Sequence, residues 1–206
     1  MADLARIESI IDGVLWMPLR QARILERLAV HLKPKRVLEI GTLHGAGSCY
    51  LGAIVSDYGG HVWTVDLPMA DHQRNPCAEE LLAKCELTNV SVIRRADGAE
   101  GWFLDFFRAK EPPLDLVYLD GGHDWKSVAA QLVMAWSALR SGGWLVMDDV
   151  QNQKYPDVGT LFDVSGTALS ALHYRIGNWG LMMKSRPRDY VPATSSASNE
   201  ETFRNG

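Results

Sequence analysis

The chain has 206 residues, a length that suits one compact domain and leaves little room for a second. Its 21 Lys and Arg against 25 Asp and Glu give a net charge of −4, so nucleic acid is not an expected partner. The 47% hydrophobic content is ample for a core, and the sequence shows neither a signal-peptide pattern nor the roughly 20-residue apolar run of a membrane span, so we expect a cytoplasmic protein.

Short β-branched segments alternate with longer helical segments along the chain, a pattern typical of a parallel sheet built from βαβ units. An amphipathic helix is expected first, at residues 19–32, with Pro18 at its start. The predicted fold is α/β, a Rossmann-like doubly wound sheet that is mostly parallel. Its strands are expected at residues 36–40, 61–66, 90–94, 116–120 and 144–148, and the helices between them at residues 48–56, 77–87, 99–109 and 125–139.

The C-terminal part of the chain changes character after the last parallel strand. Segments 172–176 and 179–184 are joined by Gly177 and Asn178, which predicts a tight antiparallel hairpin. From residue 187 on the chain is polar, and we expect a disordered tail there. The predicted organisation is one domain at residues 1–186, with an N-terminal helical segment at residues 1–33, and a tail at residues 187–206.

A glycine-rich turn follows the first strand, in the segment VLEIGTLHGAGS at residues 37–48. The dinucleotide fingerprint G-x-G-x-x-G fails in either register, because Leu43 and Tyr50 stand where glycines are required. No Gly-Lys-Ser/Thr of a triphosphate-binding loop follows either. The carboxylate of Glu39 would repel a pyrophosphate but attract a ligand that carries an ammonium and a sulfonium. These features favour S-adenosylmethionine over a dinucleotide.

Two more acidic residues stand at the ends of the next two strands. Asp66 can accept hydrogen bonds from both hydroxyls of a ribose, and Asp97 is placed to contact an adenine edge. A glycine turn alone also occurs for packing, but acids at three successive strand ends favour a cofactor site. The predicted cofactor-binding residues of this region are Glu39, Gly41, Thr42, Gly45, Gly47, Ser48, Asp66, Leu67, Asp97, Gly98 and Asp120.

A second acidic group is expected where the fourth and fifth strands end. Asp120 ends the fourth strand, and Asp148 with Asp149 ends the fifth, so the three carboxylates should meet at one edge of the sheet. They would repel one another unless a cation lies between them. Oxygen ligands without a thiol favour Mg²⁺ or another hard divalent cation over zinc. The alternatives are a helix cap or backbone contact for Asp148 and a solvent-exposed Asp149.

His123 lies three residues after Asp120, on a loop from which its side chain can turn back toward the same pocket. A neutral imidazole can take a proton from a hydroxyl group at physiological pH. The sequence therefore predicts His123 as a catalytic general base. A loop histidine that is simply hydrogen-bonded to a carboxylate is the alternative.

Two stretches, residues 37–50 and the segment LDLVYLDGGH at 114–123 continuing to GGWLVMDD at 142–149, resemble the class I S-adenosylmethionine-dependent methyltransferases. The likeness is to small O-methyltransferases that include catechol O-methyltransferase, the macrolide-sugar O-methyltransferases and the cephalosporin-hydroxylase-like group. It runs from about Pro18 to Lys184 and implies a seven-stranded sheet.

The resemblance also implies residue roles. Asp120, Asp148 and Asp149 would be metal ligands, and His123 would stand where catechol O-methyltransferase has its catalytic lysine. The segment with Trp16 and Met17 resembles the place where that enzyme covers its cofactor, so both side chains are predicted to shield the sulfonium. A hydrophobic staple before the helix explains the same two residues equally well.

The function predicted from the sequence is S-adenosylmethionine-dependent O-methyl transfer, assisted by Mg²⁺, to a hydroxyl of a small molecule or natural product such as a sugar, phenol or catechol. Two alternatives stay open: a non-catalytic S-adenosylmethionine-binding protein and a dinucleotide-binding oxidoreductase. Few residues precede the first strand, and no long insertion surrounds the acceptor site. The acceptor pocket is therefore expected to be open, completed by a second subunit of a homo-oligomer, or suited to a large substrate.

Overall fold

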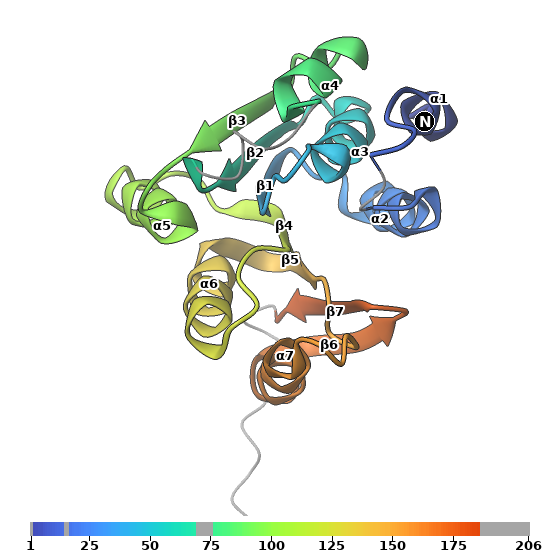
Figure 1. Cartoon of the computed structure of the whole chain (residues 1–206). Helices are drawn as coiled ribbons and strands as arrows, with labels where there is room; N and C mark the ends of the chain where they lie inside the picture. Colours follow the sequence, from blue (N-terminus) through green and yellow to red (C-terminus); the bar gives the residue numbers. More distant parts are fainter. Residues whose placement is uncertain (1, 15–16, 69–75, 186–206) are drawn as a thin grey trace, which may run out of the picture.

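The computed structural model describes residues 2–14, 17–68 and 76–185, and Figure 1 shows their arrangement. The helices are α1 (Leu4–Ile10), α2 (Leu19–Leu32), α3 (Ala46–Ser56), α4 (Ala78–Lys84), α5 (Gly98–Arg108), α6 (Trp125–Ala138) and α7 (Pro156–Leu169). The strands are β1 (Arg36–Ile40), β2 (His61–Asp66), β3 (Val90–Arg94), β4 (Leu114–Leu119), β5 (Leu139–Met147), β6 (Ser170–Ile176) and β7 (Trp179–Lys184).

The strands form one seven-stranded sheet in the order β3-β2-β1-β4-β5-β7-β6. Strands β1 to β5 are parallel, and β7 runs antiparallel to both β5 and β6. This confirms the predicted α/β sheet with a C-terminal antiparallel hairpin. The hairpin turn contains Gly177 at a φ of +56°, in the left-handed region that glycine adopts readily.

The carboxyl ends of the central strands lie level with one another. Ile40 pairs with both Val65 and Leu119, and Leu119 pairs with Met147. The hydrogen-bond ladder continues one residue further, because the amide of Asp120 donates to the Ile40 carbonyl at 2.9 Å and that of Asp148 to the Leu119 carbonyl at 3.0 Å. The loops after β1, β2, β4 and β5 therefore meet at one edge of the sheet.

Helices cover the sheet on both faces (Figure 1). Alternate strand residues point to opposite faces, so Val37 packs into the core formed with α1 to α4, and its neighbour Leu38 packs into the core formed with α5 to α7. Both side chains are fully buried. This packing fixes the level strand ends and gives the loops at the edge a rigid base.

Most predicted boundaries match the structure, and the differences have local causes. Strands β1, β2 and β3 and helix α2 have the predicted limits. Strand β5 begins five residues before the predicted 144, because Gly142, at a φ of +74°, lets the chain bend within the strand rather than before it. Helix α4 is shorter than predicted, and Glu86 adopts a φ of +59° just beyond its end.

Helix α1 lies within the N-terminal helical segment predicted at residues 1–33, whereas helix α7 was not predicted; both carry sequence signals. The Asp3 side chain caps α1 by accepting the Arg6 amide at 3.0 Å. Helix α7 begins with Pro156 in its first turn, and it buries Val158 and Phe162 at helical spacing. The segment after Asp149 is therefore a short loop followed by a helix.

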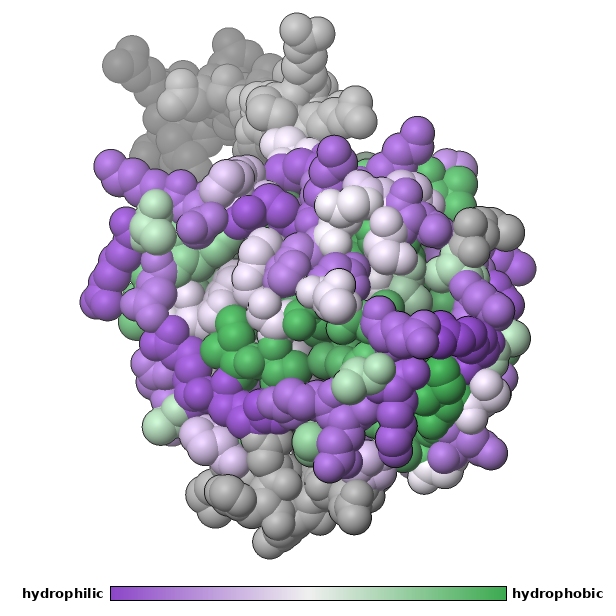
Figure 2. Space-filling model, turned by 90° about the horizontal axis from the view of Figure 1, so that it is seen from above, coloured by the Kyte–Doolittle hydropathy of each residue, from purple (hydrophilic) through white to green (hydrophobic). Residues whose placement is uncertain are grey.

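The outer surface seen from above is mostly hydrophilic, with hydrophobic side chains gathered in a band near its middle (Figure 2). Within the described ranges, every helix is too short or too polar to cross a bilayer. Trp16 and the tail predicted at residues 187–206 lie outside the described residues.

Candidate functional site

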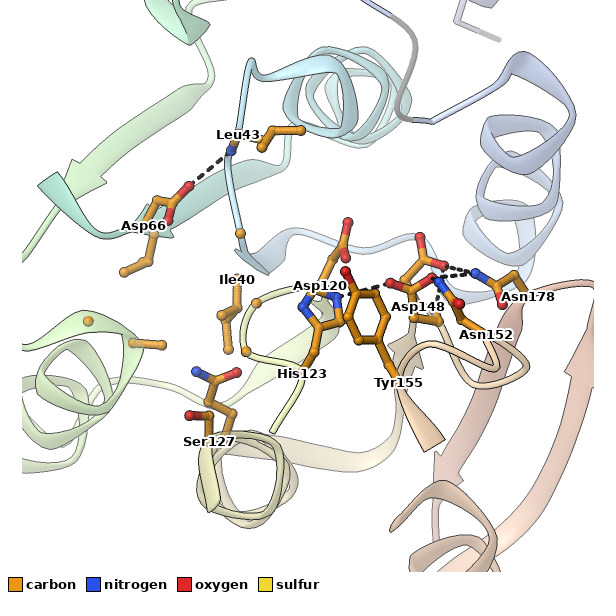
Figure 3. A pocket seen from close by; sticks show the side chains of 18 of the residues that line it. Ile40, Leu43, Asp66, Asp120, His123, Ser127, Asp148, Asn152, Tyr155 and Asn178 are labelled. Atoms are coloured by element: carbon orange, nitrogen blue, oxygen red, sulfur yellow. Dashed lines mark hydrogen bonds and ion pairs between the residues drawn. The ribbon is translucent and has the colours of Figure 1, made fainter. Parts of the chain in front are cut away.

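A pocket of about 890 Å³ opens at the sheet edge where the strand ends meet (Figure 3). This volume lies near the upper end of the roughly 300–1,000 Å³ typical of small-molecule sites. Its walls come from the loops after β1, β2, β4 and β5, the start of α2, the first turn of α5, the first two turns of α6, and the β6–β7 hairpin tip. Asp66 lies at one end of the pocket, and His123, Asp148 and Asn178 lie at the other (Figure 3).

The glycine loop packs closely against other segments of the same chain. A Cβ at Gly41 would overlap the carbonyl oxygen of Asp120, and the φ of +95° also requires glycine there. A Cβ at Gly47, in the first turn of α3, would overlap the Glu39 carboxylate. Gly45 caps α3 at a φ of +88°. The glycines therefore allow the loop to lie directly over the ends of β1 and β4.

Glu39 is a buried carboxyl group under this loop. It is 1% exposed and accepts a hydrogen bond from the hydroxyl of Ser48. Burial raises the pKa of Glu39 to about 7. A small cavity of about 20 Å³ is lined by Glu39, Met17, Tyr118 and Asp120, so Met17 lies on the same cavity as the Glu39 carboxyl group.

Asp66 fastens the glycine loop to the end of β2. Its Oδ2 accepts the backbone amides of Thr42 at 3.1 Å and Leu43 at 3.0 Å, and its Oδ1 accepts the Leu67 amide at 2.8 Å. Figure 3 shows the bond to Leu43. The Thr42 hydroxyl shares a hydrogen bond with that of Thr64 at 2.7 Å. Because a carboxylate oxygen can accept two hydrogen bonds, Oδ1 keeps room for one donor from a ligand.

Asp97 does not point into the pocket. Its carboxylate accepts hydrogen bonds from Nε and Nη2 of Arg95, at 2.8 and 2.9 Å, and its side chain is 59% exposed. The Arg95 guanidinium holds the pKa of Asp97 below its usual value. Gly98 and Glu100, from the same turn, line the pocket instead. Sequence reasoning missed Glu100, although an acid in the first turn of the helix after the third strand was a signal for it.

Asp120 differs from the other carboxyl groups of the site in lacking hydrogen-bond donors. No donor in the described part of the chain forms a hydrogen bond with its side chain. Burial, followed by the charges of Asp148 and Asp149, raises the pKa of Asp120 to about 9. Ligand atoms of Asp120, His123 and Asp149 lie within 4.8 Å of one another.

Asp148 lines the same pocket, but its oxygens already have donors from the protein. Oδ2 accepts the hydroxyl of Tyr118 at 2.7 Å, while Oδ1 accepts the Asp149 amide at 2.6 Å and Asn178 Nδ2 at 3.2 Å. The backbone contact considered from the sequence is therefore present. The structure places Asp148 beside the group formed by Asp120, His123 and Asp149.

His123 is held by two neighbours. Its Nε2 lies 2.9 Å from Asp149 Oδ2, and its ring stacks on that of Tyr155 with centroids 3.9 Å apart. Asp149, at a φ of +60°, accepts Asn152 Nδ2 at 3.0 Å and Asn178 Nδ2 at 2.6 Å through its other oxygen. The role of Asn178 was missed, because in the sequence it is visible only as a turn residue.

Comparison with known proteins gives one family and several structural likenesses. A family model described as a methyltransferase domain matches residues 38–150. No curated protein matches the chain. Two similar solved structures are the O-methyltransferase TomG from Streptomyces achromogenes, involved in tomaymycin synthesis and in complex with SAM, and an O-methyltransferase from Bacillus cereus in complex with SAH.

TomG is 19% identical to this chain with a TM-score of 0.66, over 89% of each chain. The Bacillus cereus enzyme is 20% identical with a TM-score of 0.64, over 88% of each chain. At these identities the likeness shows the fold. The family match covers more than half of the chain and includes the glycine loop, Asp120, His123, Asp148 and Asp149.

Proposed function

This chain belongs to the methyltransferase domain family, and we propose that it transfers a methyl group from S-adenosylmethionine to a hydroxyl oxygen of a small molecule. The observation that carries the proposal is that one pocket has the glycine loop and Asp66 at one end and His123 with its acidic neighbours at the other. One cavity can thus hold a cofactor and an acceptor side by side.

The residues at the glycine-loop end fit a cationic nucleoside. Glu39 offers a buried carboxylate that would attract an ammonium or sulfonium, and Asp66 Oδ1 can accept a ribose hydroxyl. Gly41 and Gly47 let the loop pack directly against Asp120 and Glu39, which shapes this end of the site. S-adenosylmethionine would supply an activated methyl group, which would pass in line to the acceptor oxygen as the carbon–sulfur bond breaks and S-adenosylhomocysteine is released.

The residues at the acidic end fit a hard divalent cation. Asp120 is partly buried and has no hydrogen-bond donor from the described chain, and Asp149 lies close to it. We propose Asp120 and Asp149 as ligands, with Asp148 as a third that Tyr118 and Asn178 hold in place. Mg²⁺ bound there would lower the pKa of an acceptor hydroxyl.

His123 is the proposed general base. When its Nε2 carries a proton and donates it to Asp149 Oδ2, the Nδ1 lone pair is free to take the proton of the acceptor hydroxyl. The stacked ring of Tyr155 limits rotation of the imidazole. Sugars, phenols and catechols are the proposed acceptor class, because their hydroxyls become good nucleophiles only after deprotonation.

A methyl-transfer assay tests this function. The protein is incubated with methyl-labelled S-adenosylmethionine and panels of catechols, phenols and glycosides, with Mg²⁺ or with EDTA. We expect label in at least one acceptor and S-adenosylhomocysteine in equal amount. Absence of binding and of transfer under every condition would refute the proposal.

The role of His123 is tested separately, because its Nε2 belongs to the same atom cluster as the carboxylates. As a base, His123→Gln lowers kcat and leaves Mg²⁺ affinity unchanged. A loss of Mg²⁺ affinity in His123→Gln would instead make the imidazole a metal ligand.

A further inference from the structure

Cys49 and Cys85 are two free cysteines that the proposed mechanism does not use. Cys49 is fully buried in the first turn of α3, and Cys85, which directly follows α4, is 2% exposed. Helix α3 lies beside α4 (Figure 1), and the Cys49 thiol donates a hydrogen bond to the sulfur of Cys85. The two helices therefore hold a pair of neighbouring thiols between them.

The face of α3 that carries Cys49 borders a groove on the outer surface. Ala53 and Ser56 lie one and two turns after Cys49 on the same face of the helix. Both line a groove of about 540 Å³ together with Cys85 and Arg6. Among the described residues, those that line this groove and those that line the cofactor pocket have no member in common. A small molecule in the groove can therefore reach Cys85 first, with Cys49 behind it.

The surroundings of the two thiols differ in a way that favours Cys85 as the nucleophile. The hydrogen bond from Cys49 lowers the pKa of Cys85, and the positive charge of Arg6 lowers it further, although burial acts in the opposite sense. The thiolate is the reactive form of cysteine, and a nearby Arg favours it. Cys49, which lies within hydrogen-bond reach, is placed to react with whatever forms on Cys85.

We propose that Cys49 and Cys85 form an oxidation site, where hydrogen peroxide entering the groove converts the two thiols into a disulfide. The Cys85 thiolate attacks one peroxide oxygen, the O–O bond breaks, and the other oxygen leaves as hydroxide, which takes a proton from solvent. Cys85 is then a sulfenic acid. The Cys49 sulfur displaces its hydroxyl group, which leaves with the Cys49 proton as water. In sum, the two thiols lose two electrons and one peroxide becomes two water molecules.

The disulfide would act on the glycine loop, because α3 and α4 both hold that loop in place. Ser48, next to Cys49, donates to the buried Glu39 carboxyl group. A Cβ at Gly45 would overlap Ala78 of α4. A covalent bond brings two sulfur atoms closer than a hydrogen bond does, so α3 or α4 must move, and either movement disturbs these contacts. The oxidised protein should therefore bind S-adenosylhomocysteine more weakly, an effect that rests on the proposed function, whereas the disulfide itself does not.

Peroxide treatment of the native protein, followed by alkylation of the remaining thiols and peptide mass spectrometry, tests the oxidation site. We expect one peptide pair that joins Cys49 to Cys85 with the loss of two hydrogen atoms, while Cys77 is alkylated. Calorimetry should show S-adenosylhomocysteine binding about 10-fold weaker after oxidation, because the loss of one buried hydrogen bond has an effect of that order. Dithiothreitol should restore the affinity, which separates the disulfide from methionine sulfoxide, a product that thiols do not reverse under these conditions.

The third cysteine provides the matched control. Cys77 lies at the opposite end of α4, so Cys77→Ser should form the same cross-link and lose the same affinity on oxidation. Cys49→Ala and Cys85→Ser should form no cross-link and keep their affinity for S-adenosylhomocysteine after the same peroxide treatment. Thermal melting checks that each variant is folded, and the peptide maps of the native protein and Cys77→Ser carry the test if the other two are not.

The outcomes separate this inference from the proposed function. Free Cys49 and Cys85 after peroxide treatment, a cross-link through Cys77, or a sulfinic acid on Cys85 in place of the disulfide would overturn the oxidation site. A link between Cys49 and Cys85 with unchanged S-adenosylhomocysteine affinity would overturn its effect on the glycine loop. If the reduced protein does not bind S-adenosylhomocysteine, the proposed function fails, and the peptide map alone decides the inference.

Discussion

The two ends of the pocket differ in how the protein treats its carboxyl groups. At the glycine-loop end, Asp66 accepts three backbone amides and Glu39 accepts the Ser48 hydroxyl. At the acidic end, Asp120 has no donor from the described chain, and its pKa is raised to about 9. The protein itself supplies hydrogen-bond donors to the carboxyl groups of the first end, whereas at the second end it leaves Asp120 without one.

Because the two ends differ in this way, they should respond separately to mutation and to metal. Changes at the acidic end should affect catalysis and Mg²⁺ binding but leave S-adenosylhomocysteine binding intact. Changes at the glycine-loop end should affect cofactor binding or stability. A variant that disturbs both ends equally would contradict their independence.

The largest effect is expected from His123→Ala. Loss of a general base lowers kcat by about 100- to 10,000-fold, and affinity for S-adenosylhomocysteine should stay within about 2-fold of the native value, because the hydrogen bond and the ring contact of His123 are with Asp149 and Tyr155 at the acidic end. Steady-state kinetics and calorimetry measure the two quantities. Tyr155→Phe, which keeps the stacked ring, is the matched control. An unchanged kcat in His123→Ala would assign the base to another group.

Glu39→Gln should produce the next largest effect, on stability. The pKa of Glu39 is about 7 in the folded protein against 4.5 for an ordinary carboxyl, so folding favours its protonated form. The burial penalty is absent below about pH 4.5, grows as the pH rises toward 7, and is complete above that at about 3 kcal/mol. The variant should therefore gain stability over the native protein at pH 8 and little at pH 5.

Urea denaturation of the cofactor-free proteins at the two pH values measures this difference. Equal stabilisation at pH 5 and pH 8 would show that the charge of Glu39 is not the cause. The same variant should bind S-adenosylhomocysteine more weakly, because it removes the proposed partner of the ligand ammonium.

A smaller effect is expected from Asn178→Ala. Asn178 donates to Asp148 at 3.2 Å and to Asp149 at 2.6 Å from the hairpin tip, so it orients two carboxylates without being a ligand itself. Loss of such an orienting residue typically weakens metal binding by about 10- to 100-fold. Mg²⁺ titration measures it, and Asn178→Asp, which loses both donors, should behave no better. Native Mg²⁺ affinity in Asn178→Ala would contradict the positioning role.

The sequence predicted those parts of the molecule that depend on local pattern. The strands before Gly41 and Leu67 end as expected, because β-branched runs and the glycine turn mark them directly. The helix that begins at Pro156 was missed despite its proline signal, because its two glycines and its β-branched residues have low helix propensity.

The partners of individual side chains were less predictable. Asp97 has the expected position in the chain, but Arg95 two residues earlier draws its carboxylate out of the pocket. The bonds from Tyr118 and Asn178 to Asp148 span 30 residues in opposite directions, so only the folded sheet brings them together. Residue type and strand position therefore predict where a site lies, and long-range contacts decide which atoms remain free in it.

Calorimetric titration of the native protein with S-adenosylhomocysteine, in Mg²⁺ and again in EDTA and with NAD as the control ligand, tests the two-ended pocket most directly. We expect S-adenosylhomocysteine to bind with the same affinity in both buffers, NAD not to bind, and a separate Mg²⁺ binding event to disappear in Asp149→Asn. Absence of S-adenosylhomocysteine binding, or tighter binding of NAD, would contradict the proposed cofactor site and with it the methyl-transfer function.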